Sequence, residues 1–376
     1  MLATQFAFVG GGEFKIPYMA EGSGGNDGQG NPRRVLGYVL PCNSNTPGLS
    51  PVWDPAGTTA FSNISAQGPF NLIGVPGARS IDATSGVYSL FNGFLQRFAK
   101  TPGTSSMMSE ALRVNATFFS VWLGSNDVLL YSIGGAVPPA NSFDPAVLTP
   151  PVMVESEITK IVDTLSRNGA KGVIANIPDI TSIPFFTTIP WNSAVLTEAQ
   201  AIQLDSIYAP LGITWNAGAN GLMIVDTAAP AGMRHATADD MILLVTPSDS
   251  LKCGQWGVNP YKPLGDRYVL DRLEKAEVQN HIVAYNAIIA GIAAKYNLAF
   301  VDINKFMKTF LSGIIYNGVA MNANFVSGGA FSLDGVHPNQ RGYALIANEF
   351  IRTINTHYGA SVPEVDATKY KGIVFP

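Results

Sequence analysis

The sequence predicts an α/β fold, a three-layer α/β/α sandwich in which helices cover both faces of a mostly parallel sheet. Short, continuous apolar runs alternate along the chain with longer segments in which apolar residues recur every three to four positions. The runs lack the polar–apolar alternation of half-exposed strands, which indicates strands buried on both faces. The polar motifs of the chain follow these runs, as active residues follow the carboxyl ends of strands in such folds.

The first elements are predicted from glycine positions and from helical periodicity. Residues 1–8 are expected to end a helix, because glycines at 10–12 favour the left-handed conformation in which helices terminate. A polar, glycine-rich loop is expected at 21–32 and a short strand at 34–40. The run at 71–78 predicts a buried strand that ends in a turn. A helix should follow, since one helical face carries Val87, Leu90, Phe91, Phe94, Leu95 and Phe98.

The rest of the chain continues the alternation of strands and helices. Strands are predicted at residues 116–123, 171–177 and 298–303, and helices at 152–167, 274–296 and 341–356. The segment at about 179–271 is irregular and rich in Pro, Gly and aromatic residues. We therefore expect one domain, residues 1–376, with this segment as an insertion. Two interpretations of the insertion stay open, a cap over a site or a surface decoration with its own small core.

Composition excludes several classes of function. Nearly half of the residues are apolar (47%) and only 13% are charged, so a sizeable core is expected and disorder is not. The net charge is −4 and no long basic run occurs, which argues against nucleic acid and anionic membrane surfaces as partners. No apolar stretch is long enough to span a bilayer. The start of the chain lacks the features of a signal peptide. Low charge and abundant Gly, Asn, Ser and Thr favour an extracytoplasmic protein whose targeting segment lies upstream.

The chain has two cysteines, Cys42 and Cys253, and neither has another Cys or a His at metal-ligand spacing. A zinc site is therefore not expected. The two residues either form one long-range disulfide or remain two buried thiols, because separation in sequence says nothing about distance in space.

The most informative segment is SLDGVHPN at residues 332–339, which precedes an amphipathic helix. Asp334 and His337 are three residues apart in a predicted turn. At this spacing the carboxylate can accept the proton of one imidazole nitrogen, which leaves the other nitrogen free to take a proton from a hydroxyl nucleophile. We expect His337 to act as general base and Asp334 to orient it and stabilise its charged form.

Two further positions are candidate hydrogen-bond donors to an oxyanion. Asn126 follows a predicted strand in the segment GSND, residues 124–127; it could donate its amide hydrogens while Asp127 caps the next helix, or could itself be a helix cap. Gly77 lies in the segment VPGA, residues 75–78, where its N–H can be approached because no Cβ intervenes. Spacing alone favours a simple type II turn at Gly77.

These segments resemble three of the four conserved blocks of the SGNH (GDSL-type) hydrolase family, and the resemblance extends from Asn71 to His357. The family carries one invariant Ser, Gly, Asn and His, one in each block. Gly77 resembles the second block, Asn126 the third, and His337 with Asp334 the last. The resemblance implies a flavodoxin-like sheet and assigns Gly77 and Asn126 to the oxyanion hole.

The block that carries the serine is not found in this sequence. The opening residues 2–14 resemble the segment that normally follows that block, so the nucleophile and the first strand are expected upstream of Met1. Ser80 and Ser125 are not expected to replace the nucleophile. The family position that corresponds to Ser125 is variable and points elsewhere, and Ser80 does not lie on the sharp, glycine-preceded turn that exposes a hydroxyl to a base.

The resemblance implies a serine esterase that acts on acyl esters, including esters of carbohydrates, and that needs no metal or organic cofactor. A small-molecule or glycan ester is the expected binding partner. Without its serine, the chain as given is expected to be weakly active or inactive. The alternative is a serine-less protein on the same fold that binds glycans or acyl groups.

Overall fold

Three parallel strands form the central sheet of the protein. The computed structural model describes residues 1–19, 33–54, 62–139 and 144–376, and within these β3 (Phe118–Val121), β4 (Lys171–Ala175) and β11 (Ala299–Val301) pair in the order β11-β4-β3. Val173, at the centre of β4, lies opposite Ser120 of β3 and Ala299 of β11. All three strands therefore end at the same edge of the sheet, as parallel strands must.

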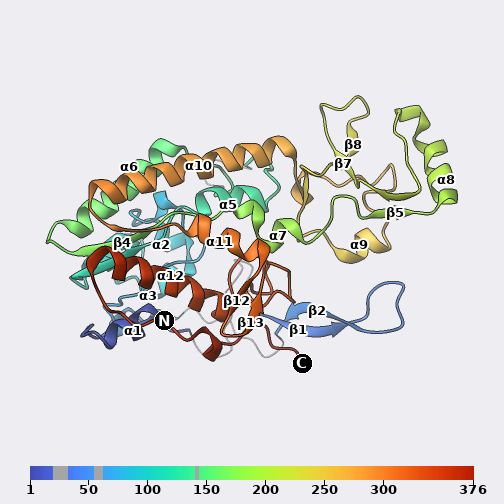
Figure 1. The fold of residues 1–376 in the computed structure, drawn as a ribbon. Helices are drawn as coiled ribbons and strands as arrows, with labels where there is room; N and C mark the ends of the chain where they lie inside the picture. The colour runs from blue at the N-terminus through green and yellow to red at the C-terminus, as the bar shows by residue number, and fades with distance from the viewer. Residues whose placement is uncertain (20–32, 55–61, 140–143) are drawn as a thin grey trace.

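Long helices pack on both sides of this sheet (Figure 1). On one side α6 (Pro151–Ser166) packs against α10 (Arg272–Lys295), and on the other α12 (Gln340–Tyr358) packs against β11. Asp271 is the N-cap of α10, and its side chain accepts from the N–H groups of Leu273 and Glu274 in a capping box. The apolar face of α10 is buried, as predicted, through Val278, Ile282, Tyr285, Ile289 and Ile292.

The α/β class and most of the predicted elements are confirmed. The strands expected at 116–123, 171–177 and 298–303 are β3, β4 and β11, and the helices expected at 152–167, 274–296 and 341–356 are α6, α10 and α12. The helix expected at the start of the chain is α1 (Leu2–Ala7). The glycine-rich loop predicted at 21–32 lies outside the described residues.

The strand predicted at 71–78 is wrong. This segment is extended but joins no sheet; the N–H of Asn71 donates to the carbonyl of Lys15 at 2.8 Å instead. Its apolar residues are not all buried, since Leu72 is 45% exposed. The continuous apolar run predicted a strand buried on both faces, but in the folded chain this segment is partly exposed and pairs with no strand.

The single helix predicted around Leu90 is also wrong. It forms as two short helices, α2 (Tyr88–Phe91) and α3 (Gly93–Phe98), because Asn92 has an extended backbone and caps α3 through its side chain. Leu95 and Phe98 of α3 are buried, whereas Phe91 of α2 is 77% exposed. The helix α4 (Met107–Leu112) follows before β3.

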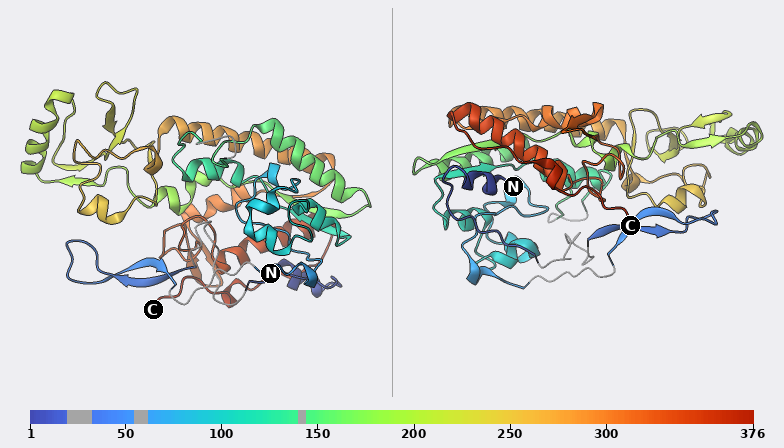
Figure 2. Two further views of the ribbon diagram at one scale, coloured as in Figure 1. Left: turned by 180° about the vertical axis from the view of Figure 1, so that it is seen from behind. Right: turned by 60° about the horizontal axis from the view of Figure 1, so that its bottom comes forward.

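The strand predicted at 34–40 is part of a separate hairpin. β1 (Arg34–Val39) pairs antiparallel with β2 (Gly48–Trp53), which was not predicted, and both project away from the central sheet (Figure 2). A disulfide between Cys42 and Cys253 joins the loop of this hairpin to the end of α9 (Ser248–Lys252). Of the two alternatives for the cysteines, the disulfide is thus the one formed.

Residues 188–270 form a lobe at one end of the molecule, beyond the N-terminal end of α10 (Figure 1). The lobe contains β5 (Ala194–Leu196), α8 (Glu198–Tyr208), β6 (Gly218–Asn220), β7 (Met223–Val225), β8 (Met233–His235), β9 (Met241–Ile242), α9 and β10 (Val269–Leu270). Its apolar core is distinct from that of the sheet and helices, and is built around Tyr208, Trp215, Met223, Ile242 and Leu264. The lobe thus has a core of its own.

The remaining α-helices and strands of the described residues are three helices and one hairpin. They are α5 (Asn126–Ile133), α7 (Pro184–Thr187), α11 (Ile303–Ser312) and the hairpin of β12 (Ile314–Tyr316) and β13 (Val319–Met321). None of the helices among the described residues has the length and apolarity needed to cross a bilayer.

A buried ion-pair network ties the lobe to α10. The Arg234 guanidinium donates to Asp226 at 2.6 Å and to both oxygens of Asp240 at 2.6 and 2.8 Å. The Asp240 side chain is completely buried and also accepts from the N–H of Arg272, the first residue of α10. Hydrogen bonds, above all from Arg234, outweigh the effect of burial and hold the pKa of Asp240 at about 2.

We predict that Arg234→Ala lowers the free energy of unfolding by about 3 kcal/mol, because it leaves the buried Asp240 carboxylate without its cation. Urea unfolding followed by circular dichroism measures the change. The matched control is Arg352→Ala on the surface of α12, where the paired side chains are largely exposed and the loss should stay below about 1 kcal/mol. Equal losses in the two variants would contradict the structural role of the network.

Candidate active site

The turn between Ser332 and His337 brings an imidazole and a carboxylate into contact. Nδ1 of His337 lies 2.7 Å from Oδ2 of Asp334. The other carboxylate oxygen, Oδ1, accepts from the Ser332 hydroxyl at 2.6 Å and from the N–H groups of Val336 and His337 at 2.8 and 2.9 Å. The contact expected from the spacing is present, and three further donors fix the carboxylate that makes it.

The charges of this pair follow from its hydrogen bonds. Burial raises the pKa of Asp334, but the hydrogen bond and charge of His337, together with Ser332 and Val336, outweigh it and bring this pKa to about 2. The ionised carboxylate can only accept, so Nδ1 of His337 carries the proton and Nε2 of the neutral ring is the free acceptor. The hydrogen bond to Asp334 is also the main cause that raises the pKa of His337 above 6.5.

The lobe and α7 support this turn from one side. The N–H of Phe185 in α7 donates to the Gly335 carbonyl at 2.9 Å, and the N–H of Leu244 donates in turn to the Phe185 carbonyl at 2.9 Å. Gly335 has a φ of +74°, and a Cβ there would come within 2.7 Å of the Leu244 side chain. Glycine is therefore required both by the backbone and by the close approach of the lobe.

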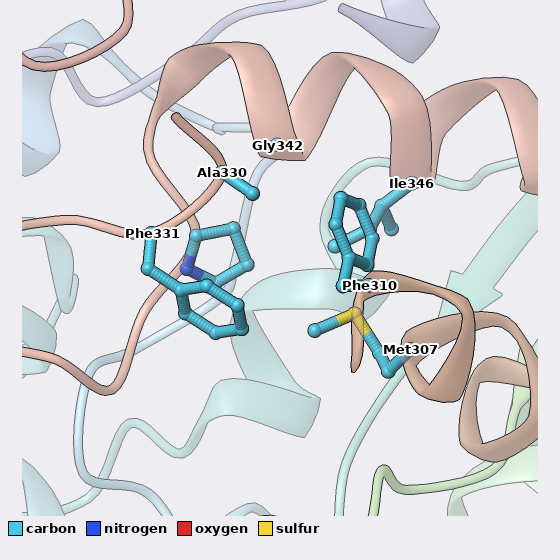
Figure 3. Close-up of a pocket in the computed structure, with 7 residues that line it drawn as sticks. Met307, Phe310, Ala330, Phe331, Gly342 and Ile346 are labelled. Atoms are coloured by element: carbon cyan, nitrogen blue, oxygen red, sulfur yellow. The ribbon is translucent and has the colours of Figure 1, made fainter. Parts of the chain in front are cut away.

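Apolar packing supports the turn from the other side. Phe331 directly precedes the turn. Figure 3 shows its side chain beside Phe310 and Met307 of α11, and all three lie under the first turns of α12. Pro338, directly after His337, lines the same small pocket, which has no room for a water molecule. The backbone on both sides of the Asp334–His337 pair is thus held by contacts outside the pair.

The second pair of candidates, Gly77 and Asn126, also lies together. The Asn126 amide nitrogen donates to the Ala78 carbonyl at 2.8 Å, which leaves its second hydrogen available. Pro76 and Gly77 form a turn in which the Ala78 N–H donates to the Val75 carbonyl, and Gly77 has a φ of +78°. This is the expected type II turn, and the Gly77 N–H has no partner among the described residues. Each of the two groups therefore has one N–H hydrogen without a partner among the described residues.

Asp127 does not cap α5, contrary to the sequence prediction. The residue before the helix is Ser125, and no side chain caps this helix. Asp127 is completely buried and accepts from both the N–H and the hydroxyl of Ser80, at 2.8 and 2.7 Å. The carboxylate thus contacts the loop that carries Gly77 and not the end of its own helix.

Different elements position the two pairs of candidates. Asn126 comes shortly after β3, and α12, which begins just after His337, packs along β11. No hydrogen bond or ring contact within the described residues joins Asn126 directly to Asp334 or His337. The Trp122 ring, one residue beyond β3, lies 6.0 Å from the ring of Phe350, which is in the second half of α12.

Comparison with known families agrees with these features. The sequence matches the GDSL-like lipase/acylhydrolase family over residues 44–350, a range that includes Gly77, Asn126, Asp334 and His337. The chain belongs to this family. The match supports an acylhydrolase type of activity. No curated protein matches the sequence.

The serines near the candidate site of this GDSL-family protein are engaged elsewhere. Ser80 is completely buried and its hydroxyl donates to Asp127, while the Ser332 hydroxyl donates to Asp334. No hydroxyl within the described residues forms a hydrogen bond with Nε2 of His337, whose side chain is 56% exposed. Nε2 of His337 thus has no hydrogen-bond partner among the described residues.

Sequence reasoning missed three contacts that shape the site of this family member. Ser332 was part of the motif, but its side-chain bond to Asp334 was not foreseen although the two are only two residues apart. The Ser80–Asp127 contact joins positions 47 residues apart, and the Phe185–Gly335 contact joins positions still farther apart. Only the first of these three had a local signal.

We predict that Asp334→Asn lowers the pKa of His337 to 6.5 or below, because the imidazolium loses the carboxylate that stabilises it. Titration of the ring by NMR, with the signal assigned from a His337→Gln sample, measures the shift. The stability that the raised pKa of His337 contributes is present below pH 6.5 and is lost as the pH rises through the raised pKa, whereas the stability that the lowered pKa of Asp334 contributes is lost as the pH falls through about 2. The control is Asp163→Asn on the surface of α6, which should leave the titration of His337 unchanged. An unaltered pKa in Asp334→Asn would refute the electrostatic coupling.

Proposed function

We propose that this protein is a serine esterase in which His337 is the general base, Asp334 orients it, and the Gly77 N–H and the Asn126 amide form the oxyanion hole. The observation that carries the proposal is the Asp334–His337 contact of 2.7 Å, which leaves Nε2 of the ring exposed and free to accept a proton. The type II turn at Gly77 and the Asn126–Ala78 bond support the assignment of the donors, since each leaves one N–H group unused.

In the proposed reaction a serine oxygen attacks the carbonyl carbon of an ester while His337 Nε2 takes the serine proton. Negative charge develops on the carbonyl oxygen, where the Gly77 N–H and the second hydrogen of the Asn126 amide stabilise it. As the carbon–oxygen bond to the alcohol breaks, the protonated His337 gives its proton to the leaving oxygen. A water molecule, deprotonated by His337 in the same way, then releases the acid and restores the serine.

We further propose that the serine lies in a turn after a strand that pairs with the free edge of β3, and that both precede Met1 in the sequence. Within the described residues β3 pairs with β4 alone. A cavity of about 500 Å³ lies at the start of β3, lined by Phe6, Phe118 and Tyr358 among others. A parallel strand added there would end at the same edge as β3, beside Asn126. This would complete a flavodoxin-like sheet in a single domain, with the lobe as an insertion.

Carbohydrate esters are the substrate class we propose, and an extracytoplasmic location is proposed with it. Aromatic side chains suited to sugar rings are exposed on the hairpin and the lobe, where Tyr38 is 66% and Tyr261 is 91% accessible. The Cys42–Cys253 disulfide supports an oxidising compartment, because structural disulfides are rare in reducing ones. Comparing acetylated polysaccharides with long-chain p-nitrophenyl esters would separate a carbohydrate esterase from a lipase.

The second candidate is a protein that binds glycans or acyl groups on the same fold without hydrolysing them. It is favoured by the absence, among the described residues, of a hydroxyl bonded to Nε2 of His337. Calorimetry that detects binding of an acetylated oligosaccharide, without release of acetate over hours, would support this candidate over the esterase.

We expect the chain of 376 residues to show only residual hydrolysis of p-nitrophenyl acetate, of the order of 10³-fold over water. A form extended by the codons that precede Met1 in the genome should be faster by several orders of magnitude. The assay compares the two forms at equal concentration. Strong and equal turnover by the two forms would overturn the proposed position of the serine, and the proposed roles of His337 and Asn126 would still stand.

In whichever form is active, His337→Gln should lower kcat by at least about 10³-fold, and Asn126→Ala by about 10²- to 10³-fold. KM should change little, because both groups act on the transition state more than on the bound ester. The control is His281→Gln on α10, a histidine outside the candidate site, which should retain parental kcat. Activity that survives His337→Gln would exclude this residue as the base.

A further inference from the structure

The loop that carries Gly77 is attached to the start of α5 by three hydrogen bonds. We define residues 76–80 as the oxyanion loop. One bond runs from the Asn126 amide to the Ala78 carbonyl at 2.8 Å. The other two run from the N–H and the hydroxyl of Ser80 to the two oxygens of Asp127, at 2.8 and 2.7 Å. The loop is therefore held by two consecutive residues of one helix.

The Ser80–Asp127 contact is completely buried, which restricts its geometry. Both side chains are completely inaccessible to solvent. Burial raises the pKa of Asp127, and the two donors of Ser80 oppose this by stabilising the ionised carboxylate. A buried carboxylate that loses a donor, or a buried N–H that loses its acceptor, costs more than an exposed one, because water cannot replace the partner. The geometry of the contact is thus narrowly defined.

The oxyanion loop needs such an attachment because it belongs to no sheet or long helix. The segment before it, predicted as a strand, joins no sheet, and Pro76 in the turn is exposed. The Asn92 amide donates to the Pro76 carbonyl at 2.9 Å, and Val75 and Ala78 are buried, but none of these contacts involves Gly77 or Ser80 themselves. Among the described residues, the bonds to Asn126 and Asp127 are the ones that fix the loop to α5.

We propose that Asp127 and Ser80 are positioning residues that set the distance between the two oxyanion donors, Gly77 and Asn126. The inference rests on the proposed function. Asn126 is itself the first residue of α5, so a carboxylate on the next residue ties the Gly77 turn to the same helix end as the second donor. Oxyanion donors stabilise the transition state only when both point at one atom, and a displacement of about 1 Å can cost as much as 10²-fold in rate.

The test uses the active form of the protein from the esterase assay and the substrate p-nitrophenyl acetate. The variants are Ser80→Ala, Asp127→Ala and the double variant. The matched control is Ser132→Ala, which removes a hydroxyl that is equally buried on α5 but donates to Val128 within the helix. We expect kcat to fall about 10-fold in Ser80→Ala and about 30-fold in Asp127→Ala. KM should stay within about twofold in both, while Ser132→Ala remains near parental.

The double variant separates positioning from general damage. If the two residues act as one unit, the double variant should be no slower than Asp127→Ala alone, whereas independent effects would multiply. Thermal unfolding of each variant shows whether the fold is kept, and Ser80→Ala, which deletes a single oxygen atom, tests the inference if Asp127→Ala does not fold.

The outcomes distinguish this inference from the proposed function. An active parent in which Ser80→Ala matches Ser132→Ala in kcat, or in which the losses multiply or appear in KM, would overturn the positioning role alone. A parent with no hydrolysis in any form would overturn the proposed function, and the positioning role with it. Loss of kcat at constant KM, without multiplication in the double variant, supports the inference.

Discussion

Carboxylates that accept several hydrogen bonds fix the parts of this protein that have no regular secondary structure. Asp334 accepts four bonds within its turn, Asp127 accepts two from Ser80, and Asp240 joins Arg234 to the start of α10. Each carboxylate replaces lost hydration with donors from neighbouring loops, so each loop has one favourable geometry. The candidate site is built almost entirely from such loops and depends on them.

The sheet provides the frame on which these loops are arranged. Because β3, β4 and β11 are parallel, the segments that follow them emerge at one edge, and Asn126, shortly after β3, is placed by that fact. The loops around that edge then connect to one another: Asn126 and Asp127 with the Gly77 turn, and Gly335 with α7. The positions of the proposed catalytic groups therefore depend on backbone contacts as much as on their own side chains.

The lobe contributes to the same arrangement although its core is separate. It reaches the His337 turn through Leu244 and Phe185, and it is joined to the β1–β2 hairpin by the Cys42–Cys253 disulfide. Of the two sequence interpretations, its own small core is what the structure displays, while its contact with Gly335 places it at the margin of the candidate site. A change in the lobe can thus be transmitted to the turn that holds the proposed base.

The sequence by itself determined what depends on neighbours in the chain. It predicted β3, β4, β11 and the long helices, whose periodicity is a local property, and it predicted the Asp334–His337 contact and the Gly77 turn, which span three or four residues. The tertiary structure alone decided that 71–78 joins no sheet, that a helix breaks at Asn92, and that Cys42 meets Cys253 across 211 residues. It also turned Asp127 away from the helix end toward Ser80. Partners distant in sequence are chosen by how the whole chain packs, and no local pattern records that choice.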